Sequence, residues 1–426
     1  MAHNGIESAQ SAECLLGRLS LELLQEILVQ LPLRFRLQPA LSAKFLWLAA
    51  SSPMTTNGQA EKVFPLGALL PPPSLGMPCT WAPVPNNVFP PPSRAVSKGG
   101  SRWLLAGQTY TVMRTPKGNP KTLKNLALSG GGTGVLLGET KWSGLNFVRG
   151  VRIVNDMVLA AHSDVRFVGC RIEGYIKQLG HGSLTLIGCT LVRVARSEQA
   201  GSNILGRDAN DHDLGDPGVK VGTRGKLTML GCRVTGPRDK PDIAARNYSE
   251  IDIQDCIFAN GVSCGNLSVG YQTYGGEVAE TPAKFHLEGC TFKPTPLAQM
   301  GADYTPPEAA EDDVFLRGSR SVWYTGALAH TYRVRDNDFA GGLMFWQLLK
   351  GVMLLEDNTF HGSCPPAAVD PYRAGTEDGA HRRRSASHVE VFVMDATSTA
   401  VVEVRGAPSW LRCEAKNGAT IESYLS

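Results

Sequence analysis

The sequence predicts a mainly β protein, a parallel β-solenoid preceded by a small α-helical segment. Three observations lead to this fold class. An eight-residue phrase with apolar residues at its first, third and eighth positions occurs seven times after residue 164. Its fifth residue is Gly or Asp and its sixth is Cys or Asn, which is typical of a corner between two strands. The first 55 residues lack this phrase and show helical spacing of apolar residues instead.

Residues 19–32 are expected to form an amphipathic helix. Leucine and isoleucine recur there at helical spacing, Ser20 is a favourable N-cap, and Glu22 complements the helix dipole in the first turn. Pro32 is expected to end the helix. A second short helix is expected within residues 39–48. Helices of this length bury little apolar surface by themselves, so their apolar faces need another surface to pack against.

A known motif is matched at Leu19, Glu22, Leu23, Leu24, Ile27, Leu28, Leu31, Pro32, Leu41, Lys44, Phe45 and Leu48. The stretch resembles the F-box, the helical module by which substrate receptors dock onto the Skp-type adaptor of SCF ubiquitin ligases. It departs from the motif at Ser20, where a proline is usual, and at Pro39. The resemblance implies that the adaptor is contacted by Leu19, Leu23, Leu24, Ile27, Leu28, Leu31, Pro32 and Phe45. The alternative is a helical hairpin that caps the open end of the solenoid.

The chain is expected to divide into four regions. Residues 1–15 are expected to be disordered, 16–55 to form the helical module, 56–99 to form a proline-rich linker, and 100–426 to form the solenoid. The linker includes the stretch PLGALLPPPSLGMPCTWAPVPNNVFPPPS, whose proline density favours an extended, semi-rigid spacer. A proline-rich ligand for another domain is the alternative reading of this stretch.

The repeated phrase defines the solenoid. Its copies are VRFVGCRI, LTLIGCTL, LTMLGCRV, IDIQDCIF, FHLEGCTF, YRVRDNDF and MLLEDNTF, which begin at Val165, Leu184, Leu227, Ile251, Phe285, Tyr332 and Met353. Successive copies start 19, 43, 24, 34, 47 and 21 residues apart. Because the two longest intervals are close to twice the shortest, we expect two degenerate copies, one of them VFLRGSRS from Val314. A period of 20 to 24 residues without helices indicates a parallel β-solenoid.

Stacked corners are expected to bring the sixth residues of the phrases into one internal ladder. Neighbouring strands lie about 4.8 Å apart, so side chains at equivalent positions of successive coils contact one another. The expected ladder consists of Cys170, Cys189, Cys232, Cys256, Cys290, Asn337 and Asn358. Cys and Asn are interchangeable there because Cys is a small hydrophobe and Asn satisfies backbone groups at the corner.

An Asn followed two residues later by a bulky apolar residue marks a turn in DNDF and DNTF. This pattern resembles the right-handed parallel β-helix of the pectin-lyase-like superfamily. The resemblance covers residues 100–426 and implies a right-handed solenoid. It implies no particular activity, since one fold carries many functions.

Composition indicates an intracellular protein without a membrane span. The formal charge of +3 predicts no nucleic-acid partner, and no apolar run is long enough to cross a bilayer. The polar start of the chain does not resemble a signal peptide. The ten cysteines are expected to be reduced, because five of them follow the repeat phase. We therefore expect a cytoplasmic or nuclear protein that is monomeric outside its complex.

A catalytic or metal site is considered at the acidic stretch RDANDHDLGDPG. Asp208, Asp211, His212 and Asp213 could bind a hard cation or act as acid and base. Their spacing matches no calcium loop, and Gly and Pro flank them, so a solvated loop is the expected structure. No cofactor, resident metal or catalytic residue is predicted.

Three insertions between phrases are candidate target-binding loops. They carry Tyr271 and Tyr274, then Tyr304, and finally Arg382, Arg383 and Arg384. Tyrosines on Gly-rich loops suit protein recognition, and an arginine run suits an acidic ligand. Packing of the tyrosines against the solenoid and simple solvation of the arginines are the alternatives.

The leading hypothesis is a non-catalytic substrate receptor of a cullin-RING ubiquitin ligase. The helical module would bind the Skp-type adaptor, and the solenoid would bind a target protein. One alternative is a β-helix polysaccharide-active enzyme or glycan binder, and another is a structural virion protein. In both alternatives the helices only cap the solenoid.

Overall fold

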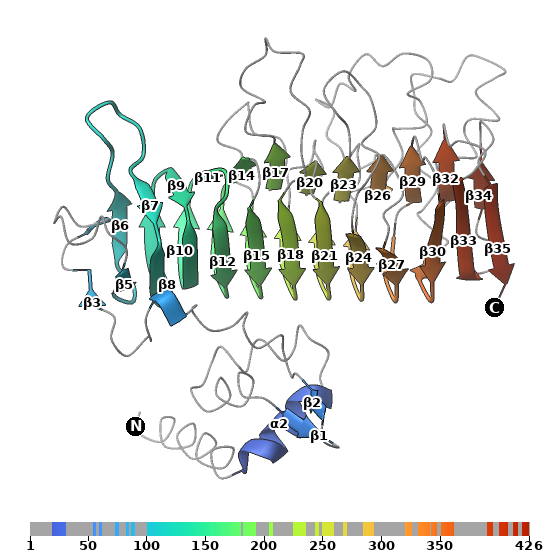
Figure 1. Cartoon of the computed structure of the whole chain (residues 1–426), viewed down its shortest axis with the longest axis horizontal. Helices are drawn as coiled ribbons and strands as arrows, with labels where there is room; N and C mark the ends of the chain where they lie inside the picture. Colours follow the sequence, from blue (N-terminus) through green and yellow to red (C-terminus); the bar gives the residue numbers. More distant parts are fainter. Residues whose placement is uncertain are drawn as a thin grey trace, which may run out of the picture.

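The computed structural model of the chain describes residues 19–30, 54–56, 59–61, 73–75, 82–84, 87–89, 100–179, 182–192, 204–207, 225–235, 243–246, 249–259, 267–270, 284–293, 320–325, 331–340, 342–346, 351–361, 390–394, 400–407, 412–415 and 420–425. The described part is mainly β and forms a long stack of parallel strands (Figure 1). Within it, no helix is both long enough and apolar enough to cross a lipid bilayer.

One coil of the stack consists of three short strands joined by two-residue corners. A complete coil is β12 (Asp164–Val168), β13 (Arg171–Glu173) and β14 (Ile176–Leu179). Each of these strands pairs in parallel with the corresponding strand of the next coil. Repetition of this unit along one axis is the arrangement of a β-solenoid.

The stacked coils produce three parallel sheets. The first sheet contains β3 (Ala82–Pro83), β5 (Gly100–Trp103), β8 (Leu126–Leu137), β10 (Leu145–Val154), β12, β15 (Ser183–Ile187), β18 (Lys226–Leu230), β21 (Glu250–Gln254), β24 (Lys284–Glu288), β27 (Thr331–Arg335), β30 (Gly351–Glu356), β33 (Ala400–Ala407) and β35 (Thr420–Leu425). The second contains β4 (Val88–Phe89), β6 (Thr109–Val112), β13, β16 (Thr190–Val192), β19 (Arg233–Thr235), β22 (Ile257–Ala259), β25 (Thr291–Lys293), β28 (Asp338–Phe339) and β31 (Thr359–Phe360). The long strands β8 and β10 bend and take part in both.

The third sheet runs in the order β34 (Arg412–Ala415), β32 (Glu390–Met394), β29 (Gly342–Trp346), β26 (Arg320–Thr325), β23 (Leu267–Gly270), β20 (Ile243–Arg246), β17 (Ile204–Arg207), β14, β11 (Met157–Leu159), β9 (Thr140–Ser143) and β7 (Thr122–Lys124). The longest connections in the chain leave or enter these strands. The first and second sheets, by contrast, keep the same two-residue corner from β12 to β31.

Register within the first sheet follows the repeated phrase. Val165 pairs with Leu184, which pairs with Leu227, so equivalent phrase positions face each other. The prediction of two degenerate copies is wrong, because β15 pairs directly with β18 and β24 pairs directly with β27. The longer intervals are insertions near the third sheet, and the end of VFLRGSRS contributes Arg320 and Ser321 to β26.

Backbone angles explain the Gly or Asp at each corner. The fifth phrase residue has positive φ in all seven copies, for example 58° at Gly169 and 51° at Asp255. Glycine adopts this conformation without strain, and Asp tolerates it better than most residues. At Gly289 a Cβ atom would lie 2.6 Å from Oδ1 of Asp255, the end of a side chain that can move aside, so the positive φ is the main reason for glycine at that corner. The expectation of an unusual corner conformation is confirmed.

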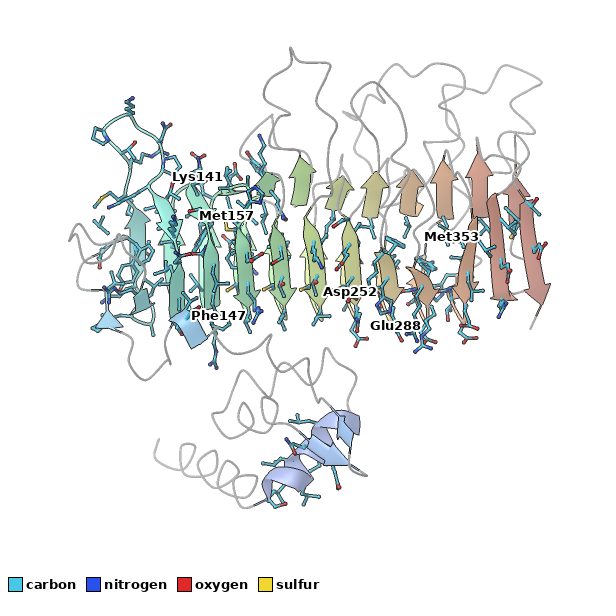
Figure 2. The ribbon with its side chains drawn as sticks, in the orientation of Figure 1. Lys141, Phe147, Met157, Asp252, Glu288 and Met353 are labelled. Atoms are coloured by element: carbon cyan, nitrogen blue, oxygen red, sulfur yellow. The ribbon has the colours of Figure 1, made fainter. Side chains whose placement is uncertain are left out.

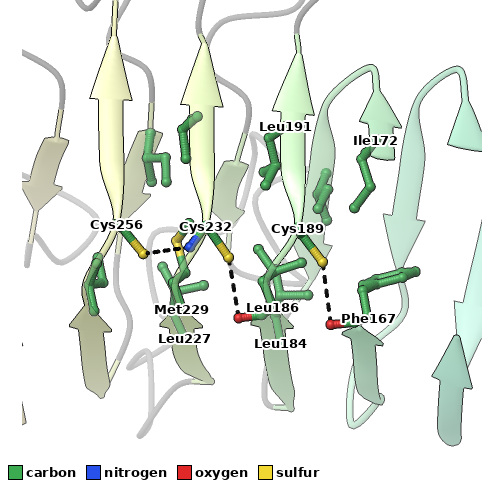
Figure 3. Packing of buried hydrophobic residues seen from close by; sticks show 14 of the residues in the cluster. Phe167, Ile172, Leu184, Leu186, Cys189, Leu191, Leu227, Met229, Cys232 and Cys256 are labelled. Carbon is green, nitrogen blue, oxygen red and sulfur yellow. Dashed lines mark hydrogen bonds between the residues drawn. The ribbon is translucent and has the colours of Figure 1, made fainter. Parts of the chain in front are cut away.

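Apolar residues fill the interior of the coils. In β12 the side chains of Val165 and Phe167 point inward and are buried, in line with strand alternation. The eighth phrase position supplies a row of aromatic rings in the C-terminal half, where Phe292 stacks on Phe258 at 4.8 Å and on Phe339 at 5.2 Å between ring centroids. Figure 3 shows how leucines and cysteines of neighbouring coils pack in register.

The stack begins earlier than expected. β3 pairs with β5 and β4 pairs with β6, although both lie inside the stretch interpreted as a proline-rich linker. A short antiparallel hairpin, β1 (Met54–Thr56) with β2 (Gln59–Glu61), and the 3-10 turn η2 (Pro73–Leu75) precede it. Residues 1–15 and the second expected helix at 39–48 lie outside the described residues.

Candidate functional site

The N-terminal candidate surface is the helix α2 (Leu21–Gln30). The amide nitrogen of Leu23 donates to Oγ of Ser20 at 3.3 Å, and the amide of Leu24 donates to the Ser20 carbonyl at 3.1 Å. Ser20 is therefore the N-cap, as the sequence predicts. The cap fixes where the helix starts and so which residues share a face.

The apolar residues of α2 divide into two stripes. Leu24 and Leu28 are buried, with 5% and 2% of their surface exposed, and Gln25 is buried between them. Leu23 and Ile27 are 43% and 45% exposed. Each pair is spaced four residues apart and lies on one side of the helix. Of the broad face expected to bind the adaptor, the stripe of Leu24 and Leu28 is thus buried within the chain, whereas the stripe of Leu23 and Ile27 is exposed to solvent.

The remaining expected adaptor contacts are only partly placed. Leu19 is half-buried immediately before the helix. Leu31, Pro32 and Phe45 lie outside the described residues.

The expected internal ladder is present. Its cysteines and asparagines are all buried and follow one another from coil to coil. Four of the five thiols donate backward to a carbonyl of the preceding coil, as Cys189 does to Phe167 and Cys232 to Leu186, both at 3.4 Å between sulfur and oxygen (Figure 3). Cys256 instead donates to the carbonyl of Gln254 in its own coil, and its sulfur accepts from the amide of Cys232 at 3.3 Å. Burial raises the pKa of Cys170, Cys189, Cys232 and Cys256 well above the usual value for a thiol. These thiols therefore stay neutral and serve the structure.

The asparagines continue the ladder with stronger hydrogen bonds. The amide of Cys290 donates to Oδ1 of Asn337 at 2.9 Å, and the amide of Asn337 donates to Oδ1 of Asn358 at 3.0 Å. Nδ2 of Asn337 donates to the carbonyl of Leu287 at 3.0 Å. Nδ2 of Asn337 also donates to Oδ1 of Asn358 at 3.0 Å, so the side chain of Asn337 links three successive coils, β24 to β30.

A network of charged side chains lies on the outer face of the first sheet. His286 on β24 bridges two carboxylates, with Nδ1 at 3.0 Å from Oδ1 of Asp252 and Nε2 at 2.8 Å from Oε2 of Glu288. Nε of Arg335 on β27 donates to Oε1 of Glu288 at 2.8 Å. Lys284 extends the network, with Nζ at 3.3 Å from Oδ2 of Asp252. Figure 2 shows Asp252 and Glu288 on adjacent strands of this face.

The network shifts the titration of its members. The carboxylate of Asp252 raises the pKa of His286, burial opposes this, and Glu288 adds to the rise. Burial alone would raise the pKa of Asp252, but hydrogen bonds from His286 and Gln254 and the charge of Lys284 hold it at about 2. Burial also pushes the pKa of Glu288 upward, and Arg335 and His286 more than offset it. Both carboxylates are therefore ionised over the physiological range.

Sequence reasoning did not identify this network, although its signal is present. The second and fourth residues of three consecutive phrases are Asp and Gln, then His and Glu, then Arg and Arg. Strand alternation places these positions on the outer face, and the register places them side by side. Opposite charges at the same phrase position of successive copies are therefore the sequence pattern that predicts this charged network.

The other candidate residues from the sequence have no described position. The acidic stretch at Asp208, Asp211, His212 and Asp213 lies outside the described residues, as do the tyrosines and arginines of the three insertions, Tyr271, Tyr274, Tyr304, Arg382, Arg383 and Arg384. Within the described ranges no group of three or more His, Cys, Asp and Glu side chains is arranged to hold a metal ion.

Comparison with protein-family models, with curated proteins and with solved structures finds no match to this chain.

Proposed function

We propose that this chain is a non-catalytic substrate receptor of an SCF-type ubiquitin ligase, in which α2 docks a Skp-type adaptor and the solenoid binds a target protein. The observation that carries the proposal is the division of α2 into a buried stripe and an exposed stripe. A helix whose exposed side carries Leu23 and Ile27 four residues apart fits the groove-binding mode of helix recognition. Leu24 and Leu28 are buried within the chain, which leaves Leu23 and Ile27 as the apolar side chains open to a partner.

The finer description of the solenoid belongs to the same proposal. We take it to be a right-handed β-helix similar to the pectin-lyase-like superfamily. Three parallel sheets, a corner residue of positive φ and an asparagine ladder support this assignment. Such a stack offers a long rigid surface with insertions gathered at one sheet, which suits recognition of a protein.

The chemistry of the outer network supports binding over catalysis. A general base must accept a proton near neutral pH. Asp252 and Glu288 are held by several cations, and their pKa values lie below the usual range for carboxylates. The described thiols of the ladder are free and fit a reducing, intracellular compartment.

A pull-down with a purified eukaryotic Skp-type adaptor tests the proposal. The intact chain is expected to retain the adaptor, and a Leu23→Asp, Ile27→Asp double variant is expected to lose it. Val352→Asp is the matched control, because Val352 is also an exposed apolar residue, 53% exposed on β30 of the stack. The proposal fails if the intact chain does not retain the adaptor, or if the helix variant and the control retain it equally.

A further inference from the structure

The outer face of the first sheet carries two buried apolar residues over its N-terminal strands. Ala127 on β8 and Phe147 on β10 pair with each other, and both alternate with inward core residues, so their side chains point away from the interior. Both are buried. In the C-terminal half, the same face carries the charged network of Asp252 and Glu288 (Figure 2). We call Ala127 and Phe147 the outer apolar strip.

Burial of an outward strip requires a cover from within the chain. The three sheets account for every described strand except the hairpin β1–β2, and the described elements outside the sheets are that hairpin, α2 and η2. In η2, Leu75 is buried while its neighbour Ser74 is exposed. A three-residue turn cannot bury a leucine by itself, so Leu75 needs an apolar surface elsewhere.

The reach of the chain limits which surface this is. Leu75 lies seven residues before Ala82, the first residue of β3, and seven residues span at most about 25 Å. β3 pairs with β5, β5 with β8, and β8 with β10, which places β10 about 14 Å and β12 about 19 Å away at the usual strand spacing. β18 would lie about 29 Å away, beyond that reach. In the view of Figure 1, η2 is drawn at the lower ends of β8 and β10.

We propose that η2 seats Leu75 on the outer apolar strip and so anchors the segment before β3 to the solenoid. Residues 56–99, which the sequence predicts to be a linker, then contain a point of attachment to the solenoid. The inference depends on burial, strand direction and chain reach, and it does not depend on the proposed adaptor binding. It fixes the point from which the N-terminal module extends.

A double-mutant cycle in the full chain tests the contact. Leu75→Ala and Phe147→Ala are each expected to lower the urea midpoint of unfolding, and the double variant is expected to lower it by clearly less than the sum. Leu354 is the control partner, because it is an outward, half-buried leucine on β30 of the same sheet. The effects of Leu75→Ala and Leu354→Ala are expected to add. Additive effects in both pairs would overturn the proposal.

Dye binding provides a second test that does not alter the sheets. Leu75→Asp is expected to expose the strip and to raise the fluorescence of the hydrophobic dye ANS, whereas Ser74→Asp is expected to leave it at the wild-type level. Unchanged fluorescence in Leu75→Asp would contradict the contact. Loss of adaptor binding in the pull-down above would leave both results unaffected.

Discussion

At the residue scale, the ladder shows how one polar side chain holds several coils together. Asn337 accepts from the amide of Cys290 and donates to a carbonyl on β24, and both groups are buried. Removing the side chain leaves a buried donor and a buried acceptor without these partners, and each such group costs about 1 to 3 kcal/mol. The stability that the Asn337 side chain contributes therefore depends more on its hydrogen bonds than on its volume.

We expect Asn337→Ala to lower the free energy of unfolding by about 2 to 4 kcal/mol. The measurement is urea denaturation of the full chain. Thr359→Ala, at an exposed position on β31, is the control and is expected to change stability by less than about 0.5 kcal/mol. Equal effects of the two variants would mean that the ladder contributes nothing specific.

His286 gives the outer network a dependence on pH. Its folded-state pKa is raised by Asp252 and Glu288, so the stabilisation from its protonated form is complete below the unfolded pKa of about 6.5 and is lost as pH rises through the folded value. Asp252 acts in the opposite direction. Its pKa is lowered to about 2, so its stabilisation is complete above the unfolded pKa of about 4 and is lost as pH falls toward 2.

We expect the difference in stability between the wild type and His286→Gln to shrink as pH rises from 5.5 to 8.5. The difference should not exceed about 1 kcal/mol, because the network is in partial contact with water. Thermal unfolding at several pH values measures it, with the exposed His162→Gln as the control. A difference that is constant or grows with pH would show that His286 is not held in its protonated form by the two carboxylates.

At the element scale, insertions lie outside the repeating unit. β15 pairs with β18 across an interval of 43 residues with the same register that β12 and β15 keep across 19. β17 supplies the third strand of that coil, and residues 208–224 then lead to the start of the first-sheet strand in the next coil. The equivalent connection between β14 and β15 is only residues 180–182.

We therefore expect replacement of residues 208–224 by a four-residue Gly/Ser linker to leave the stack folded, with the unfolding midpoint within a few degrees of wild type. Loop length has only a weak effect on stability. Far-UV circular dichroism and thermal unfolding measure the outcome. Loss of cooperative unfolding would show that this insertion contributes a coil of its own.

Elements differ in how far the sequence could predict them. The phrases predict β12, β15, β18, β21, β24, β27 and β30, because alternation and a fixed corner coincide in each. β10 was missed since Val151 stands where the later copies carry Cys or Asn, and β3 was missed because its proline suggested a spacer. The strand propensity of a segment cannot show which distant strand it pairs with. For the same reason the sequence could not show that the long intervals between phrases are insertions and contain no degenerate copies.

The candidate site was predicted less completely than the fold. Helical spacing identified the apolar residues of α2 and Ser20 as its cap, but spacing cannot separate Leu24 from Leu23, because burial depends on what packs against the helix. The outer network requires the register between β21, β24 and β27, and that register becomes visible only when the phrases are aligned.

At the scale of the whole molecule, the chain combines a rigid scaffold with a separate helical surface. Three parallel sheets share one continuous apolar core from Val84 to Val404. The outer apolar strip and the charged network occupy opposite halves of one face of that scaffold (Figure 2). A substrate receptor needs two separate surfaces. In the proposed function α2 binds the adaptor, which leaves the surface of the solenoid free for the target.

The most direct test of this account is a titration of the purified full chain with a purified Skp-type adaptor. We expect one-to-one binding with a Kd in the micromolar range or tighter, equivalent to at least about 8 kcal/mol. Leu23→Ala and Ile27→Ala should each weaken it by about tenfold or more, as interface anchors do, and Val352→Ala should leave it unchanged. Absence of binding by the wild type, or equal affinity in all four proteins, would contradict the central claim.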